Sequence, residues 1–356
     1  MLVVRKPNWR NPLGASFLSL AMLSALLHGA VNGHGQMNYP PSTRQGLPGK
    51  TWPGALSGEG AGGYCEQPNS MNPQNPLNGA CMLFSQPSAA HPNISTIPGP
   101  PTNNASQFRT NNINVSSGPA DWTARMPWRA PGSAAVLGSG CGVAGGGDVF
   151  NSNGGWPPTG MDQGADVLDV LSGPPGGRPV TTWARGATVR VAWGMWANHG
   201  GGYSWRLCRN EPGVRVTEAC FQQTPLNFSG TMSWLQHLNG SVYAIPRVTV
   251  TRGTHPAGSQ WARNPIPTCR DKHGFLDACG PDGLEYPEPL PGLHGFGYHN
   301  STACTDNSCD KYHDYSIVDN VVIPRGIPPG DYLVSWRWDC EQTHQIWQNC
   351  ADVAIV

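Results

Sequence analysis

Short stretches in which apolar and polar residues alternate are the feature that most constrains this chain. Six stretches show the pattern: 188–193, 203–208, 241–245, 247–251, 332–338 and 351–355. A period of two residues is typical of a β-strand that buries one face. The 46 glycines and 35 prolines favour turns and loops over helices. Short strands with turn-rich connections therefore predict an all-β fold, a β-sandwich.

Two long segments rich in glycine, proline, asparagine and serine interrupt this pattern, at residues 45–135 and 253–315. They carry six of the eleven cysteines: Cys65, Cys81, Cys269, Cys279, Cys304 and Cys309. Tryptophan side chains in the first segment favour burial against other residues, so we expect ordered surface loops that disulfides hold in place. A partly disordered insertion is the alternative for this segment.

The N-terminus has the parts of a secretory signal. Residues 1–13 carry three basic residues and no acid, residues 15–27 are apolar, and Val31 and Gly33 occupy positions −3 and −1 of a cleavage site. We predict a signal peptide over residues 1–33 and a single domain over residues 34–356. No later apolar run is long enough to span a bilayer, so we expect an extracellular, secreted protein without a membrane partner.

Charge and cysteine content agree with secretion. The chain has 22 basic and 22 acidic residues, and only 12% of it is charged, so nothing favours nucleic acid as a partner. Ten of the eleven cysteines could pair in an oxidising compartment. Six asparagines begin sequons for N-glycosylation: Asn93, Asn104, Asn114, Asn227, Asn239 and Asn300.

Cleavage after Gly33 would make His34 the first residue of the mature chain. An N-terminal histidine offers its imidazole and its α-amine, whose reference pKa is about 8, so a metal displaces the amine proton readily. A second histidine would complete a three-nitrogen site of the kind that suits Cu(II). The alternative is that cleavage simply leaves a histidine at this position.

The second histidine candidate is His199, in a glycine-rich turn between two predicted strands. The glycines allow a tight turn and should leave the imidazole exposed; a buried structural histidine is the alternative. His344 lies near the last strand, where it would be an acid close to the site or a surface residue. The remaining mature histidines lie in loops without clear strand neighbours: His91, His237, His255, His273, His294, His299 and His313.

Three blocks in order resemble a lytic polysaccharide monooxygenase of the group once called chitin-binding type-4. They are His34-Gly35, the run 199–208 (HGGGYSWRLC), and the C-terminal run from Asp331 through Asp352. The resemblance implies an immunoglobulin- or fibronectin-III-like β-sandwich with a copper cofactor held by a histidine brace. His34 would supply its α-amine and ring nitrogen, and His199 the third nitrogen.

The same resemblance implies a polysaccharide substrate such as chitin or cellulose, an external electron donor and a monomer. Breaking a strong C–H bond needs a one-electron metal that activates oxygen or peroxide, while the protein sets the geometry. The tryptophans near His199, which are Trp193, Trp196 and Trp205, could hold a sugar chain by stacking, although most of the 14 tryptophans are expected in the core.

Two residues near the C-terminus take site roles by this resemblance. A tyrosine or phenylalanine normally occupies the axial side of the copper, and the matching position, counted back from Asp352, is Trp347. An indole cannot ligate as a phenolate can, so Trp347 would leave that side open or apolar. Gln345 matches an amide that could hydrogen-bond the oxidant; an ordinary surface glutamine is the alternative.

Two disulfides are expected. Cys340 and Cys350 flank the segment that bears Gln345 and Trp347, and a bridge between them would rigidify this side of the site. Cys208 and Cys220 could close a local loop.

Two other functions remain open at this stage. One is a copper- or carbohydrate-binding protein that keeps the brace but does not oxidise. The other is a glycoside hydrolase, which would need two carboxylates placed across a sugar. Asp339 and Glu341 stand two apart in a strand-like stretch and could share a face for that purpose.

Overall fold

The computed structural model describes residues 34–40, 83–85, 128, 130–144, 166–170, 179, 181–237, 240–268, 283–291, 293–295, 315–341 and 345–356. Several expectations fall outside these residues. They are the signal peptide over residues 1–33, five of the six sequons, the six cysteines of the two long segments, and His344 with four of the loop histidines.

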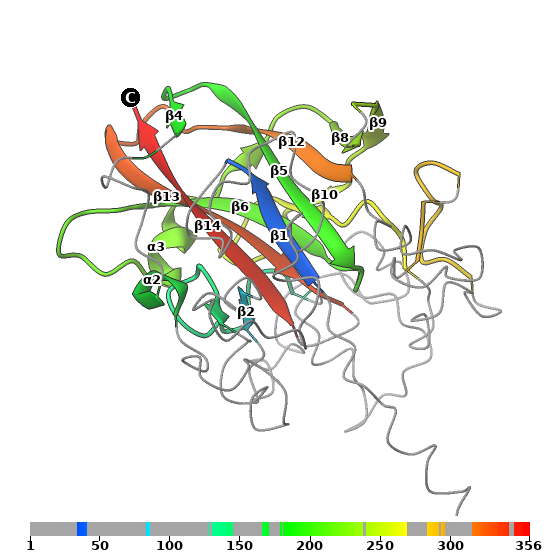
Figure 1. Cartoon of the computed structure of the whole chain (residues 1–356), viewed down its shortest axis with the longest axis horizontal. Coiled ribbons are helices and arrows are strands. Elements are labelled where there is room, and N and C mark those ends of the chain that lie inside the picture. Colours follow the sequence, from blue (N-terminus) through cyan, green and yellow to red (C-terminus); the bar gives the residue numbers. More distant parts are fainter. Residues whose placement is uncertain are drawn as a thin grey trace, which may run out of the picture. The chain divides into compact units, whose positions relative to one another are not determined.

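Two β-sheets form the described part of the chain, as the alternating pattern predicts (Figure 1). Sheet 1 has the order β1-β5-β12-β8-β9, with β7 also paired to β12. Its strands are β1 (His34–Tyr39), β5 (Thr188–Ala197), β12 (Tyr315–Val322), β8 (Met232–His237), β9 (Val242–Pro246) and β7 (Asn227–Phe228).

Sheet 2 has the order β10-β11-β6-β13-β14-β2-β3, and β4 runs parallel to β14. Its strands are β10 (Thr249–Val250), β11 (Trp261–Arg263), β6 (Gly202–Arg209), β13 (Gly330–Asp339), β14 (Ile346–Ile355), β2 (Leu83–Ser85), β3 (Val143–Ala144) and β4 (Thr181–Trp183). Two short helices, α2 (Val167–Val170) and α3 (Glu218–Gln223), complete the described elements. The all-β sandwich prediction is confirmed.

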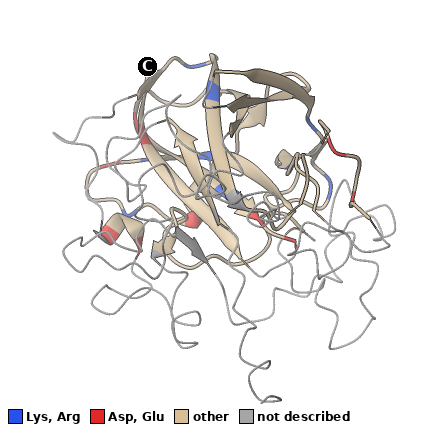
Figure 2. Cartoon of the chain, turned by 45° about the vertical axis from the view of Figure 1, so that its right-hand side comes forward, with Lys and Arg blue, Asp and Glu red and all other residues tan. Residues whose placement is uncertain are grey.

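Gly33–Val356 forms one compact unit. Basic and acidic residues are sparse and interspersed over the described strands, in keeping with the equal counts of the two signs (Figure 2). In the described residues, no helix is both long and apolar enough to cross a membrane.

The inner faces of the two sheets make the main core, which is rich in tryptophan. Trp193 on β5 packs against Trp336 and Trp338 on β13, with ring centroids 5.0 and 5.5 Å apart. Strand β1 lies across β14 here, because the amide of Met37 donates to Asn349 Oδ1 at 2.8 Å (Figure 1). Trp193 and Trp205, proposed as sugar-stacking residues, are buried in this core.

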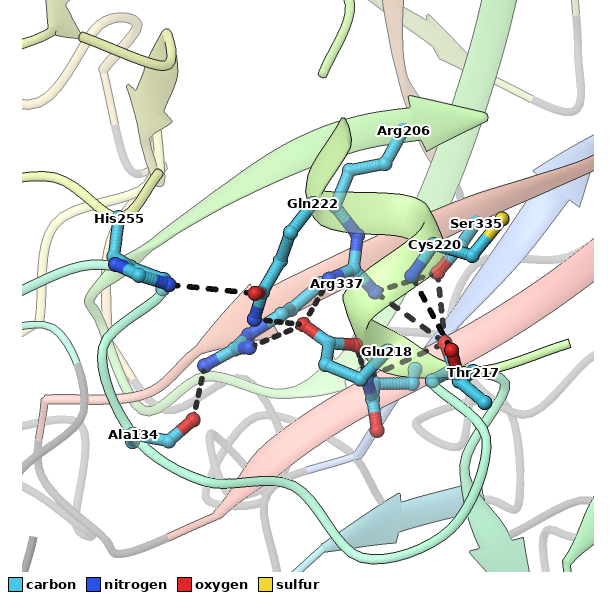
Figure 3. A network of polar contacts seen from close by, with 12 residues as sticks. Ala134, Arg206, Thr217, Glu218, Cys220, Gln222, His255, Ser335 and Arg337 are labelled. Carbon is cyan, nitrogen blue, oxygen red and sulfur yellow. Dashed lines mark hydrogen bonds and ion pairs between the residues drawn. The ribbon is translucent and has the colours of Figure 1, made fainter. Parts of the chain in front are cut away.

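The outer face of sheet 2 is also buried, which explains why β13 shows burial on both sides. Helix α3 and residues 130–144 cover it through a network of charged side chains (Figure 3). Glu218 lies between two guanidinium groups: it pairs with Arg206 and accepts from Arg337 Nη1 at 2.9 Å. Arg337 also donates to Asp339 at 2.7 Å and to the carbonyl of Ala134 at 3.0 Å.

Two disulfides fasten this cover. The predicted pair Cys208–Cys220 is present and joins β6 to α3. The predicted pair Cys340–Cys350 is wrong, because Cys350 is bonded to Cys141. The register explains the error: Cys350 lies opposite Ser335, five positions before Cys340 on the chain. Five residues of strand span about 17 Å, far beyond the reach of a disulfide.

Acid should weaken this network at Glu218. Burial raises the pKa of Glu218, but Arg206 and Arg337 outweigh it and hold the pKa below its ordinary value. A lowered folded-state pKa adds stability above the unfolded pKa of about 4.3, and this is lost as the pH falls through the folded value. We expect Glu218→Gln to lower the melting temperature at pH 7 and to flatten its fall between about pH 5 and pH 3.

Melting followed by circular dichroism across this range tests the expectation. Glu211→Gln is the matched control, since Glu211 pairs with Arg209 at an exposed site and should change little. An equally steep acid loss in Glu218→Gln and the parent would contradict the assignment.

Candidate metal centre

The pairing of β1 with β5 brings the two predicted brace residues to one end of sheet 1. In the antiparallel register, His34 is the partner of Ala197, the last residue of β5. His199 follows two positions later, in the turn that leads into β6. Residues 165 positions apart in the sequence are therefore neighbours in the fold.

The turn after His199 requires its glycines. Gly200 and Gly201 have φ angles of +63° and +78°, which side chains other than glycine rarely adopt. A Cβ atom at Gly201 would lie 2.0 Å from the carbonyl oxygen of Asp339, and one at Gly202 would lie 2.3 Å from the ring of Trp128. The predicted tight turn is present.

The predicted exposure of His199 is wrong, because its side chain is fully buried. The turn packs against the end of β13: the carbonyl of His199 accepts from the amide of Glu341 at 3.1 Å, and the carbonyl of Gly200 accepts from Trp338 Nε1 at 2.7 Å. The glycines let the turn approach β13 this closely, and the turn is buried as a result.

Asn198 holds the turn from the other side, a role that the sequence did not single out. This buried amide donates to the carbonyls of Ile266 and Gly295 at 3.0 and 3.1 Å. Its oxygen accepts from the amide of Gly200 at 2.8 Å and from Asn264 Nδ2 at 2.9 Å. The only signal was its position next to His199 in the chain.

Trp347 and Gln345 lie at the same end of the sandwich. Trp347 is opposite Trp338 in the β13–β14 pair, and a Cβ atom on Gly35 would lie 2.8 Å from the Trp338 ring. The residue after His34 therefore packs beside the tryptophan that faces Trp347. The fold brings the start of β1, the His199 turn and the start of β14 together.

Gln345 is not an ordinary surface glutamine. It is 2% exposed, Trp347 is 1% exposed, and Trp347 Nε1 donates to Gln345 Oε1 at 3.2 Å. The indole therefore orients the amide that the resemblance assigns to this position.

A second unforeseen feature is a pair of buried carboxyl groups, Glu285 and Glu341. Burial, followed by the neighbouring charge of Glu285, raises the pKa of Glu341 well above its ordinary value, while Arg263 acts in the opposite direction. Glu341 Oε1 and Cγ would lie 2.8 Å from a Cβ atom on Gly200. A buried carboxyl with a raised pKa thus packs against the turn.

The structure separates the two carboxylates of the hydrolase alternative. Asp339 is held by Arg337 and accepts from the amide of Gly132 at 2.8 Å in the network outside sheet 2. Glu341 faces Gly200 and Glu285 instead. A pair suited to glycoside hydrolysis needs both groups on one sugar.

Three of the loop histidines contact aromatic, amide or carboxylate side chains. His237 packs against Tyr243 and Tyr315, His255 bonds to Gln222 at 3.3 Å, and His294 bonds to Glu288 at 2.5 Å.

The expected donors would suit copper. If residues 1–33 were removed, the α-amine of His34 and the imidazoles of His34 and His199 would be three nitrogens, the ligand type and number that a planar Cu(II) site prefers. The β1–β5 register places both residues that carry these nitrogens at one end of one sheet. Among the residues that the structure describes, no three or more His, Cys, Asp or Glu side chains gather in a group that could hold a metal ion.

No protein-family model matches the chain. Several solved structures are similar to it at low identity. It is 18% identical to the lytic polysaccharide monooxygenase AA15 from Thermobia domestica in the Cu(I) state, over 50% of this chain and 63% of that chain, with a TM-score of 0.26. The match thus spans less than two thirds of that protein.

Two further structures cover more of the chain. The cellulose-active monooxygenase CelS2 in complex with copper is 15% identical over 90% of this chain and 98% of its own, with a TM-score of 0.28. A chitin-binding domain from Burkholderia pseudomallei is 11% identical over 91% and 100%, with a TM-score of 0.32. Function must therefore follow from the residues of this chain.

Proposed function

We propose that the chain is a secreted, copper-dependent lytic polysaccharide monooxygenase that oxidatively cleaves glycosidic bonds in a polysaccharide such as chitin or cellulose. The observation that supports this function best is the β1–β5 register, which places His34 beside the turn that carries His199. Removal of residues 1–33 would add the α-amine of His34 to the two imidazoles.

In this proposal His34 and His199 hold the copper, and the residues around them set its geometry. Asn198 and the glycines after His199 fix the turn by the hydrogen bonds described above. The backbone that carries the His199 imidazole is therefore held in place. Pairing with β5 and packing on Trp338 fix the backbone of residues 34 and 35. Bound copper would supply one-electron chemistry with an external electron donor and oxygen or peroxide.

Gln345 and Trp347 shape the side of the site that faces the oxidant. The indole of Trp347 presents an apolar surface where a phenol would present a possible ligand, and its N–H holds Gln345 Oε1. The Gln345 side chain is thereby oriented toward a hydrogen-bonding role at the oxidant. Burial of both residues excludes water from that side.

A copper- or carbohydrate-binding protein without oxidation is the second candidate. Trp347 favours it, because an indole stands where the family that the chain resembles normally has a tyrosine or phenylalanine.

Mass spectrometry of soluble products distinguishes the two candidates. The chain beginning at His34, loaded with copper and supplied with a reductant, would be incubated with chitin, cellulose, xylan and starch. We expect oxidised oligosaccharides from at least one substrate, and none above background from His199→Ala. His255→Ala, which alters an exposed histidine elsewhere, should retain the activity. Copper binding without oxidised products would contradict the monooxygenase and leave the binding protein.

A further inference from the structure

The outer face of sheet 1 carries a pocket that the proposed metal centre does not use. Inward residues of this sheet, such as Val191, Ile317 and Leu235, belong to the core. The residues between them point outward. Six of these outward side chains line the pocket: Arg190, Trp234, Gln236, Val242, Val318 and Asn320.

Trp234 lies in the middle of this pocket's part of the sheet. Trp234 is paired with Val318 on one side and Ala244 on the other, and Val318 is paired in turn with Ala192. The pocket beside the indole has a volume of about 160 Å³. Trp234 is partly exposed there, and Val242 at the rim is 54% exposed.

The lining has the chemistry that recognises a pyranose. A sugar ring presents a face of C–H groups, which packs on an indole, and a rim of hydroxyl groups, which bonds to planar amides and guanidinium groups. Trp234 supplies the first kind of surface. Gln236, Asn320 and Arg190 supply the second, and no carboxylate is among the lining residues.

A sequon for N-glycosylation lies next to this pocket on the same face. The sequon is Asn227-Phe228-Ser229. Phe228 is paired with Val321 and points into the core. Asn227 is paired with Val322, points outward and is exposed. Asn320 stands two residues before Val322 on β12. It is therefore a diagonal neighbour of Asn227, with about 7–8 Å between their positions.

We propose that this pocket binds the first sugars of an N-linked glycan on Asn227. Attachment forms a bond between Asn227 Nδ2 and C1 of N-acetylglucosamine; the amide loses a proton, and the lipid pyrophosphate of the host's oligosaccharide donor leaves. The inference rests on the secretion that forms part of the proposed function, but it does not depend on copper or on oxidation. The glycan would cover Trp234 and Val242 and tie β7 to β8 and β12.

Glycopeptide mass spectrometry and melting temperatures of protein secreted by a eukaryotic host test this inference. We expect Asn227 to carry a glycan and Trp234→Ala to lower the melting temperature by several degrees. In an Asn227→Gln background, which has no glycan there, Trp234→Ala should cost clearly less. Asn239→Gln removes another sequon of the sequence and is the matched control; it should leave the effect of Trp234→Ala unchanged.

Titration with the free disaccharide N,N′-diacetylchitobiose, followed by NMR, tests whether the glycan attached to Asn227 already fills the pocket. The Asn227→Gln protein should bind this disaccharide, and Gln236→Ala, which keeps the indole, should weaken the binding. The glycosylated parent should show none, because its own glycan fills the pocket. Equal binding by both proteins, an unmodified Asn227, or an equal cost of Trp234→Ala in both backgrounds would overturn the proposal. None of these results bears on the copper site.

Discussion

Replacement of Arg337 by alanine is expected to lower the free energy of unfolding by about 3–5 kcal/mol, because it leaves the buried carboxylate of Asp339 without its charged partner and Glu218 with only one of its two arginines. Arg337 is fully buried and bonds to Glu218, to Asp339 and to the carbonyl of Ala134 (Figure 3). Its loss would also remove one of the contacts that hold residues 130–144 against sheet 2, while the carboxylate of Asp339 and the disulfide Cys141–Cys350 would remain.

Urea unfolding followed by tryptophan fluorescence measures this loss. Arg209→Ala is the matched control: Arg209 is half exposed and pairs with Glu211, so the change should cost at most about 1 kcal/mol. If the two variants were equally stable, the network outside sheet 2 would not hold the fold together. Arg337→Ala should be most harmful above about pH 5, because the lowered pKa of Glu218, to which Arg337 contributes, adds stability above its unfolded pKa.

The strands that the sequence predicts are those whose inner and outer residues differ in polarity. β5, β6 and β13 show this contrast over most of their length, and all three lie in the middle of a sheet. β12 escaped prediction because its inner face carries Asp319, a buried carboxylate that pairs with Arg247 at 3.0 Å and interrupts the apolar side. A pattern of polarity cannot show that a charge is neutralised by a residue 72 positions away.

The candidate site depended on non-local pairing, which strand patterns do not contain. The resemblance pointed to His34 and His199, and only the β1–β5 register shows that they are neighbours. The partner of Cys350 is 209 residues away, in a loop that no local rule places on β14. The burial of His199 and Gln345 likewise follows from tertiary packing around Asn198, Trp338 and Trp347.

A chain that begins at His34 is expected to bind Cu(II) much more tightly than the same chain with four alanines ahead of His34. The extension turns the α-amine into a peptide amide and removes one of three nitrogen ligands. Removing a residue that only hydrogen-bonds to a metal ligand typically lowers metal affinity about 10–100-fold. Removing a ligand itself should lower the affinity by more than that. His199→Ala should lose affinity similarly in the chain that begins at His34.

Calorimetric titration and electron paramagnetic resonance with Cu(II) test this without any substrate. Four alanines added after Val356 are the matched control and should change neither the affinity nor the three-nitrogen spectrum. The affinity of the chain that begins at His34 should rise with pH up to about 8, since the metal competes with a proton for the amine. If the extended and unextended chains bound copper equally, the α-amine would not be a ligand. The β1–β5 register would then join His34 to His199 for structural reasons alone.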